Sequence, residues 1–462
     1  MRRSNDEARC RFITIAASFL CLAVAIGSSI VTGDIEGPTR ELRIRQVITN
    51  LTVTCFVMGF GIGPLFLAPL SEIFGRKPIY CISMFFYFIF TLPSALAHVA
   101  GTLIVPRMIA GLAASAPMCN VGGTIADVWE TENRGAPMGI FSGTIFLGPC
   151  VGPIIGGWIG QRAGWRWIYW VLFIFVGATF LFTLVMPETL APVLLKKKAA
   201  RLRKETGDPM YRTLEELEKK PFKEVVVIAL LRPFIMLFTE PIIICMTVYL
   251  SFVYALLYLL FFAFPIAFAE IRHFSLGITG TTFVSIMIGI IGALCLIPVQ
   301  EMVYKRATTQ GDYPEARLFP MMFGAPILPI ALFIFAWTGA YAHVHWIAPL
   351  IAGVLFGFAM LALYVSANSY IIDSYSAYAA SAIAAKTFLR SEVGAVVPVF
   401  VTPMFHNMKF QWAGFLLAMI SVLIAPIPYI FFMYGERVRR RSKKATKAVK
   451  GGGEGREKKG EV

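Results

Sequence analysis

The residues of this sequence best suited to carry chemistry are three charged side chains, Arg107, Glu240 and Asp373, that lie within or at the end of long apolar runs. A charge in such surroundings is costly, so it is expected to face a cavity or a partner of opposite charge. A carboxyl group there binds a proton more readily than it does in water. The three residues are therefore candidates for proton exchange that is coupled to another event.

Two of these charges also have a purely structural interpretation. Arg107 lies about one turn from the end of its apolar run, so its long side chain could extend to water instead. Glu240 directly precedes Pro241, and the pair could serve only to end a helix.

Polar and aromatic side chains accompany the charges. The candidates for lining a cavity are Asn120, Thr124, Tyr254, Tyr258, Asn368 and Tyr370. Tyr254 and Tyr258 are four residues apart, so their rings and hydroxyls share one face of a helix. They could line a site for aromatic or amphipathic molecules, or simply pack against each other.

The elements that position these residues follow from the composition. Of the 462 residues, 57% are hydrophobic and 15% are charged, whereas soluble chains have about 45–50% and about 25%. A chain of this kind cannot hide its apolar surface in water, so we expect an all-α integral membrane protein. Twelve runs approach the roughly 20 residues that a spanning helix needs. They lie near 12–32, 48–69, 78–99, 103–125, 136–158, 167–187, 234–262, 277–298, 318–338, 346–369, 379–404 and 411–434.

Six runs precede a charged gap and six follow it, an arrangement typical of secondary transporters built from two repeated halves. The expected division is a cytosolic N-terminus (1–11), a first half (12–187), a basic cytosolic linker (188–232), a second half (233–435) and a disordered basic cytosolic tail (436–462).

The net charge of +15 indicates how the chain faces the membrane. With both termini in the cytosol, 34 of the 42 basic residues fall in inner segments and 7 in outer ones, if Lys386 and Arg390 are counted as inner. This is the bias of the positive-inside rule. Asn50 and Thr52 then form a possible glycosylation sequon on the outer side. The sequence shows no folded basic domain, so nucleic-acid binding is not expected.

Three ordered stretches resemble the major facilitator superfamily: 68–78 with its acidic and basic residues, 105–129 with Arg107, and 148–157 with its repeated glycines. The third stretch matches the motif of drug:H⁺ antiporters. Further stretches are similar to the fungal twelve-span drug:H⁺ antiporter family, namely 122–127, 164–167, 187–192, 232–241 and 314–318. Ala68, Glu72 and Ile73 replace a glycine, an aspartate and a basic residue of the family pattern, which weakens the charge pattern of the first motif.

The resemblance implies roles for these motifs. An inner gate would comprise Glu72, Gly75, Arg76 and Lys77, with Asp127 as a partner of the basic pair. The antiporter motif, which would seal the interface between the halves, comprises Gly148, Gly152, Pro153, Gly156 and Gly157. Arg107 would belong to a proton-linked network.

We therefore expect a proton-coupled exporter of hydrophobic or weakly acidic small molecules that works by alternating access. Glu240 is taken as the only deep carboxylate, and Phe262 stands where polyamine-transporting relatives would need a glutamate. The alternatives are a proton-coupled importer of a small organic acid, a polyamine transporter, and a nutrient sensor that binds without flux. The expected partners are protons, a small-molecule substrate and the lipid bilayer.

We expect a monomer in the plasma membrane, with the vacuolar membrane as the alternative. The eight cysteines show no metal-ligand spacing, and no nucleophile–base pair or phosphate loop is evident. No metal, no cofactor and no enzymatic activity are therefore expected.

Overall fold

The computed structural model describes residues 2–129, 135–213, 216, 222–308, 314–375 and 378–442. Within these residues the chain is helical and contains no strand. The helices of the first half are α1 (Arg2–Ser29), α2 (Glu36–Glu41), α3 (Gln46–Phe74), α4 (Arg76–Ala95), α5 (Ala100–Val128), α6 (Gly135–Ala163) and α7 (Trp165–Val185), with a 3-10 turn η1 (Ile30–Asp34) after α1.

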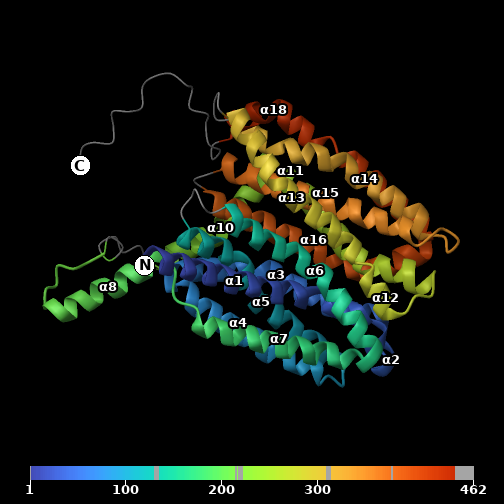
Figure 1. Cartoon of the computed structure of the whole chain (residues 1–462), viewed down its shortest axis with the longest axis horizontal. Coiled ribbons are helices and arrows are strands. Elements are labelled where there is room, and N and C mark those ends of the chain that lie inside the picture. The colour runs from blue at the N-terminus through green and yellow to red at the C-terminus, as the bar shows by residue number, and fades with distance from the viewer. Residues whose placement is uncertain are drawn as a thin grey trace.

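A second group of helices follows the linker helix α8 (Ala191–Thr206). It comprises α10 (Phe222–Thr239), α11 (Pro241–Pro265), the π-helical turn η2 (Ile266–Glu270), α12 (Leu276–Thr281), α13 (Val284–Thr308), the 3-10 turn η3 (Pro314–Leu318), α14 (Phe319–Gly339), α15 (Ile347–Ser374), α16 (Ala379–Met408), α17 (Phe410–Ile424) and α18 (Ile427–Arg441). Figure 1 shows the two groups as adjoining bundles, with α1 to α7 mostly below and the second group mostly above, except that α12 reaches down beside the first group.

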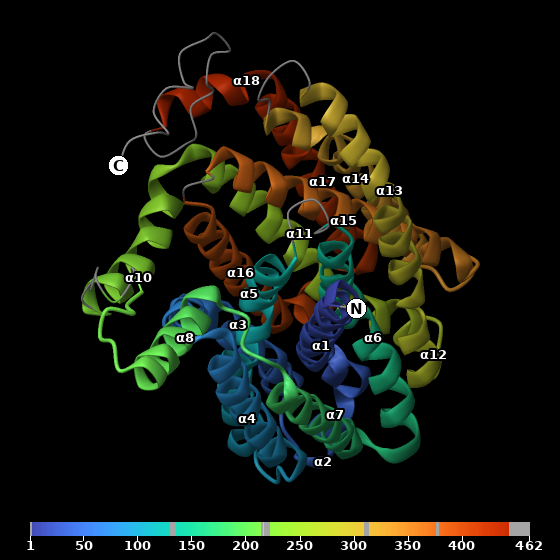
Figure 2. The same cartoon turned by 60° about the vertical axis from the view of Figure 1, so that its left-hand side comes forward.

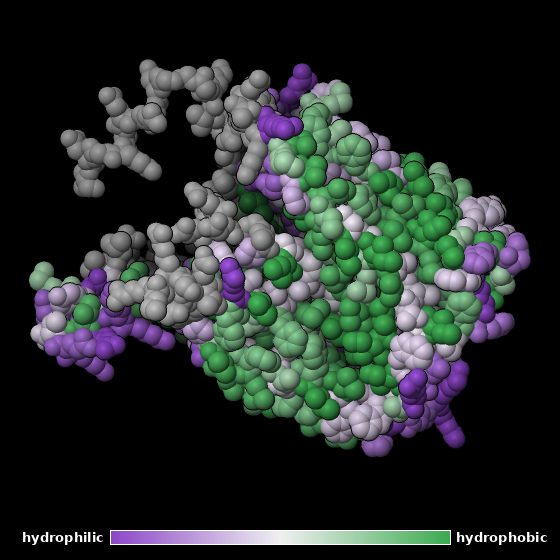
Figure 3. Space-filling model, in the orientation of Figure 1, coloured by the Kyte–Doolittle hydropathy of each residue, from purple (hydrophilic) through white to green (hydrophobic). Residues whose placement is uncertain are grey.

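The apolar runs form these helices because a backbone in an apolar solvent must satisfy its hydrogen bonds within the segment. In the described residues, twelve helical segments are long and apolar enough to cross a membrane, six ending by Val185 and six beginning at Pro241. This confirms the predicted all-α class with twelve spans. An apolar band covers the middle of the molecule, and hydrophilic residues gather at its two ends (Figure 3).

The two ends of the bundle differ. We call the end that carries α8 and the beginning of α1 the linker end, and the end that carries α2 and α12 the far end (Figure 1). Helix α8, which lies in the predicted basic linker, projects from the linker end and stops at Gly207, which has a φ of +70°. Such a left-handed conformation is one that glycine adopts without a steric penalty.

The seventh span differs from its predicted range of 234–262. The chain breaks at Glu240, which has an extended backbone, and α11 begins at Pro241. Proline suits the first turn of a helix because its missing N–H has no partner there. Residues 222–239 thus form the separate helix α10, and the span continues through Pro265 into η2.

The tail also differs from the prediction of disorder over 436–462. Helix α18 continues to Arg441, and Arg439 forms a buried, two-pronged ion pair with Glu315 of η3 (Nε–Oε1 2.9 Å, Nη2–Oε2 2.8 Å). Residues 443–462 lie outside the described part of the chain, as does Arg134. The beginning of the predicted tail is therefore part of the folded second half.

The halves meet mainly along three pairs of helices. Helix α16 packs against α3, and α12 and α13 pack against α6. Figure 2 shows α3 beside α16 and α6 beside α12 and α13, with α1 and α11 nearer the centre. A site between the halves is therefore bordered by helices from both.

Candidate functional site

The most unusual group in the interior is a pair of basic residues on α16, Lys386 and Arg390. They are four residues apart and therefore share one face of the helix. Lys386 is fully buried and Arg390 is 2% exposed. Both were predicted to belong to an inner segment, which is wrong: both lie inside the span Ala379–Met408. Both residues lie within the predicted run 379–404, so the sequence alone could have placed them inside a span.

Lys386 is held by two side chains of α15. Its Nζ donates to Asn368 Oδ1 at 2.5 Å and to the Tyr364 hydroxyl at 3.2 Å. The same nitrogen lies 4.5 Å from the centre of the Tyr364 ring. Asn368, one of the predicted cavity residues, therefore takes part in the site, whereas Tyr364 was not predicted.

Arg390 is surrounded by aromatic rings. Its guanidinium carbon lies 4.1 Å from the ring centre of Tyr254 and 5.1 Å from that of Tyr364. Its Nε and Nη1 atoms are buried and have no hydrogen-bond partner. Tyr254 in turn stands beside Tyr258, with ring centres 5.1 Å apart and hydroxyl oxygens 3.4 Å apart. The predicted tyrosine pair thus forms one wall of this group.

We call Tyr254, Tyr258, Tyr364, Asn368, Lys386 and Arg390 the central cluster. All six belong to the second half, but the first half reaches them through Phe146 of α6. The Phe146 ring packs edge-on against Tyr364, with ring centres 4.6 Å apart. Among the described residues, no carboxylate forms an ion pair with either cation of the cluster. The central cluster is therefore a positively charged, aromatic site where the two halves meet.

A carboxylate lies on another face of the same helix. Glu392 is half-buried, and its Oε1 atom is buried without a hydrogen-bond partner. It faces Gly61 of α3, where an added Cβ would lie 2.6 Å from Glu392 Oε1. The sequence analysis took Glu240 as the only deep carboxylate and missed Glu392, although it too lies in the run 379–404.

Arg107 is fully buried in α5 and does not extend to water. Its Nη2 donates to the carbonyl oxygen of Gly27 in α1 at 2.8 Å, and its guanidinium carbon lies 4.3 Å from the ring centre of Phe56 in α3. Its Nε and Nη1 atoms are buried without partners. The arginine therefore ties three helices of the first half together and retains hydrogen-bonding capacity.

The two predicted acidic candidates for proton exchange lie elsewhere. Glu240 is buried at the beginning of α11, where it accepts hydrogen bonds from the Tyr375 hydroxyl at 3.0 Å and from Ser442 Oγ at 2.5 Å. The prediction placed Glu240 deep in the span. In the structure it lies at the end of the span, because the helix begins only after it. This matches the structural alternative, in which the residue ends one helix and starts another.

Asp373 is occupied by charged and polar partners within the second half. It pairs with Arg317 (Nε–Oδ2 2.9 Å) and accepts a hydrogen bond from the Tyr304 hydroxyl at 3.1 Å. Tyr370, a predicted cavity residue, is also fully buried near the linker end, beside Glu315 and Gly435. Neither residue belongs to the central cluster, because their helix faces turn toward neighbouring helices of the same half.

Arg76 and Asp127 of the predicted inner gate lie together at the linker end, beside a further acidic residue, Glu188. Arg76 Nε lies 3.6 Å from Asp127 Oδ2, as the resemblance implied. Glu72 is exposed and has no ion pair with the basic residues among the described contacts. Instead, Glu188 accepts the backbone N–H groups of Arg76 at 3.0 Å and of Lys77 at 3.2 Å.

Gly75 allows this arrangement. Its φ of +105° is one that residues with a side chain rarely adopt, and an added Cβ would collide with the Glu188 carboxylate. Glu188 therefore fastens the α3–α4 turn to the chain segment after α7.

Two predicted cavity residues belong to the same gate. Asn120 Oδ1 accepts hydrogen bonds from Ser71 Oγ at 2.9 Å and from Arg76 Nη1 at 3.4 Å. The Thr124 hydroxyl contacts that of Tyr80 at 2.8 Å. Their shared face of α5 turns toward α3 and α4, so they do not line the central cluster.

The glycines of the predicted antiporter motif pack closely against neighbouring backbone and side chains toward the far end. Added Cβ atoms at Gly148, Gly152 and Gly156 would collide with α1 and η1, so these glycines allow α6 to pack within the first half. Gly157 faces the other half, where an added Cβ would lie 2.6 Å from the carbonyl oxygen of Leu276. Gly280 of α12 likewise approaches the carbonyl oxygen of Pro153. This backbone contact joins the halves.

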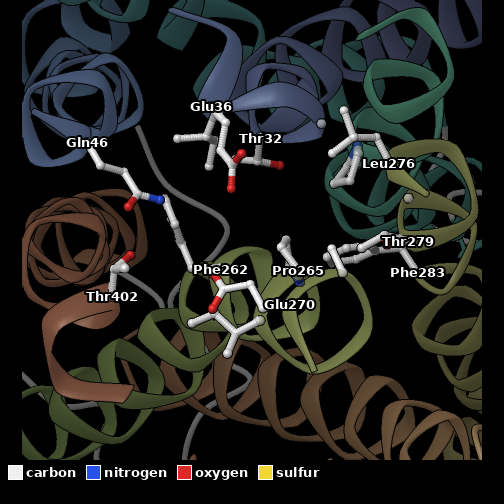
Figure 4. Close-up of a pocket in the computed structure, with 16 residues that line it drawn as sticks. Thr32, Glu36, Gln46, Phe262, Pro265, Glu270, Leu276, Thr279, Phe283 and Thr402 are labelled. Atoms are coloured by element: carbon white, nitrogen blue, oxygen red, sulfur yellow. The ribbon is translucent and has the colours of Figure 1, made fainter. Parts of the chain in front are cut away.

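A small pocket remains beside this contact. Thr32 and Gln46 of the first half and Glu270 and Thr402 of the second line it and face one another (Figure 4). The Glu270 carboxylate forms a hydrogen bond with His406, with Oε2 and Nε2 2.8 Å apart. The pocket lies at the far end, separate from the central cluster.

Asn50 does not fit the predicted glycosylation site. Its side chain is 1% exposed, and its Nδ2 donates to the carbonyl oxygen of Pro398 at 2.8 Å. A glycan cannot be attached to an amide that is enclosed between α3 and α16. The sequon is therefore an interface contact between the halves.

Comparisons with known proteins agree with this architecture. A family model described as the Major Facilitator Superfamily matches residues 12–398. The MFS-type transporter paaT of Penicillium rubens is 44% identical over 94% of this chain and 79% of its own length. The multidrug transporter mdrA of Aspergillus fumigatus is 39% identical over 94% of this chain and 72% of its own length.

The fold also matches a solved structure. The xylose transporter XylE from E. coli, in a partially occluded inward-open conformation, has a TM-score of 0.65 and 15% identity. The match covers 92% of this chain and 99% of that one.

Proposed function

The chain belongs to the Major Facilitator Superfamily, and from this premise we propose that it exports hydrophobic or weakly acidic small molecules by proton-coupled alternating access. It is a multi-pass membrane transporter and not an enzyme. A similar protein named as an efflux pump, FUBT of Fusarium oxysporum, supports export as the direction. In this proposal a single chain in the plasma membrane forms the whole pathway.

The observation that carries the proposal is the place of the central cluster. Arg390 lies eleven residues into α16, which has 30 residues, so it is about 17 Å along the helix, near its middle. Phe146 of the first half touches Tyr364 of the second at this level. Substrate sites of such transporters lie near the midplane, between halves that rock around them.

The close contact between the halves at the far end supports a mechanism in which the two halves rock against each other. Gly157 and Gly280 allow α6 and α12 to touch backbone to backbone. Separating this contact would open the cluster to the far side, while the contacts of Arg76 with Asp127 and Glu188, all within the first half and the segment directly after it, would hold the α3–α4 turn in place as that half moves.

We assign the cytosol to the linker end. Without Lys386 and Arg390, which are inside the membrane, 32 basic residues remain in the inner segments against 7 in the outer ones. The positive-inside rule therefore still supports this orientation.

We propose Glu392 as the group that carries the proton. Its carboxyl faces Gly61 at the α3–α16 contact between the halves. Among the residues whose side chains are described, the charged ones on helices packed against α16 lie toward the linker end: Glu72 on α3, Asp373 on α15, and Arg232 on α10, whose guanidinium lies over the Tyr378 ring. None forms an ion pair with Glu392 among the described residues. Protonation would remove a charge from the interface that must separate.

Arg107 would act in the first half of the same network, because its Nε and Nη1 are buried donors without partners. Glu240 and Asp373 would instead hold helix ends in place.

Inside-out membrane vesicles with an acidic lumen test this function. We expect uptake of 2-naphthoate or its neutral analogue 2-naphthamide that a protonophore abolishes, and no uptake of spermidine. The Glu392→Gln variant should lose the response to the pH gradient while remaining in the membrane, because its amide cannot exchange a proton. Uptake only under the reversed gradient would identify an importer, and binding without flux would identify a sensor; either result would refute export.

A further inference from the structure

We propose that the central cluster binds the anionic group of an aromatic or lipophilic organic acid, with Lys386 and Arg390 as the residues that recognise the charge. This inference rests on the proposed transport function and names the substrate class of the same site. The two cations belong neither to the motifs nor to the predicted site, although half of the cluster consists of predicted cavity residues.

The first argument is the uncompensated charge. Lys386 and Arg390 are buried side by side, and their described contacts are with tyrosine rings, hydroxyls and one amide oxygen. Burying a charge is costly unless it is paired, and two like charges on adjacent turns repel each other. A bound anion removes both penalties at once, whereas a cation would add to them.

The second argument is the unused hydrogen-bonding capacity. Arg390 Nε and Nη1 are buried donors without partners. Lys386 has three donors and gives two of them to Asn368 and Tyr364. Hydrogen bonds from charged donors to a carboxylate are among the strongest that proteins form. Donors of two residues therefore remain available for one acidic group.

The third argument is the hydrophobic lining beside the charges. Tyr254, Tyr364 and Asn368 are only half-buried inside the bundle, so the space beside them is accessible. The rings of Tyr254 and Tyr364 lie against the cations. Tyr258 packs against Tyr254, and Phe146 packs against Tyr364. Aromatic side chains favour a substrate with a flat apolar ring system, because aromatic rings pack well against one another in stacked or edge-to-face arrangements. Charge and lining together select an aromatic acid.

The site also gives a physical reason for coupling. Lys386 and Arg390 share one face of α16, and Glu392 follows two residues later, about 200° around the helix from Arg390. Substrate binding and protonation of Glu392 would thus act on opposite faces of α16, the helix that forms the contact with α3. A change of charge on either face alters the packing of the same element.

The test measures binding by the purified full-length protein in detergent, without any transport. The probes are labelled 2-naphthoate, neutral 2-naphthamide and cationic 2-naphthylmethylamine. We expect naphthoate to bind about tenfold or more tightly than the amide, as expected for hydrogen bonds to a charged group, and the amine to bind least. Equal binding of naphthoate and amide would overturn the proposal.

Substitutions then locate the site. Arg390→Gln and Lys386→Gln should each weaken naphthoate binding about tenfold or more and leave amide binding unchanged, which also shows that the variants are folded. Arg390→Lys should retain part of the preference. Arg162→Gln, an equal loss of charge at an exposed position of α6, is the matched control and should change nothing. A preference for naphthoate that survives both glutamine variants would refute this site.

The binding assay separates this inference from the function on which it rests. Selective binding of naphthoate without proton-driven flux would refute export and support the site. Proton-driven flux with no preference for the acid would support export and refute the site.

Discussion

The backbone contact between α6 and α12 makes a sharp prediction about the conformational equilibrium. In Gly157→Ala, the new Cβ would lie 2.6 Å from the Leu276 carbonyl oxygen, whereas ordinary contacts begin at about 3.4 Å. A backbone carbonyl cannot rotate away as a side chain would, so the helices must separate by about 0.8 Å at this point or the contact must open. The substitution therefore penalises the state in which the far end is closed.

The size of the effect follows from the cost of overpacking, which is about 1–3 kcal/mol. Alanine also favours a helix over glycine by about 1 kcal/mol, but this gain applies to both conformations and cancels. The equilibrium should therefore shift toward the state with an open far end by about 5- to 150-fold.

The assay is the labelling rate of a single cysteine by a membrane-impermeant maleimide added to the far side. The cysteine replaces Thr402, which lines the far-end pocket and is 7% exposed, on a background without native cysteines. Gly157→Ala should accelerate labelling. Gly139→Ala, in the same helix, is the matched control because its added Cβ would meet nothing within 4 Å. Equal labelling rates in the two variants would refute the role of this contact as the closure.

Two further predictions concern stability and processing. Glu315→Gln should cost about 3–5 kcal/mol by leaving the buried charge of Arg439 unpaired, and should clearly lower the melting temperature of the purified protein. Glu301→Gln breaks a pair of the same kind whose carboxylate is 47% exposed and should cost about 1 kcal/mol or less; similar melting temperatures for the two variants would contradict the assignment. Endoglycosidase treatment should leave the electrophoretic mobility of the chain unchanged, because Asn50 is enclosed, and a mobility shift that Asn50→Gln abolishes would show that the packing is wrong.

Much of the architecture could be predicted from local patterns. A spanning helix is a property of about 20 consecutive residues, so the twelve spans could be counted without knowledge of their packing. The glycine spacing of 148–157 and the Arg76–Asp127 partnership belong to short motifs, and the helices around them have the expected neighbours. The seventh span was shifted because apolar residues continue on both sides of the break at Glu240.

The composition and the order of apolar runs were sufficient to establish a membrane transporter of two six-span halves. They could not show which charges face the centre, because that depends on the rotation of each helix, and rotation is set by packing against neighbours. Glu240 and Asp373 carry the same chemistry as Glu392, yet the first two are held by partners at helix ends and the third faces the other half. Only the packing of α15 and α16 brings Tyr364, Asn368, Lys386 and Arg390 together, and so turns scattered residues into a site for an anion.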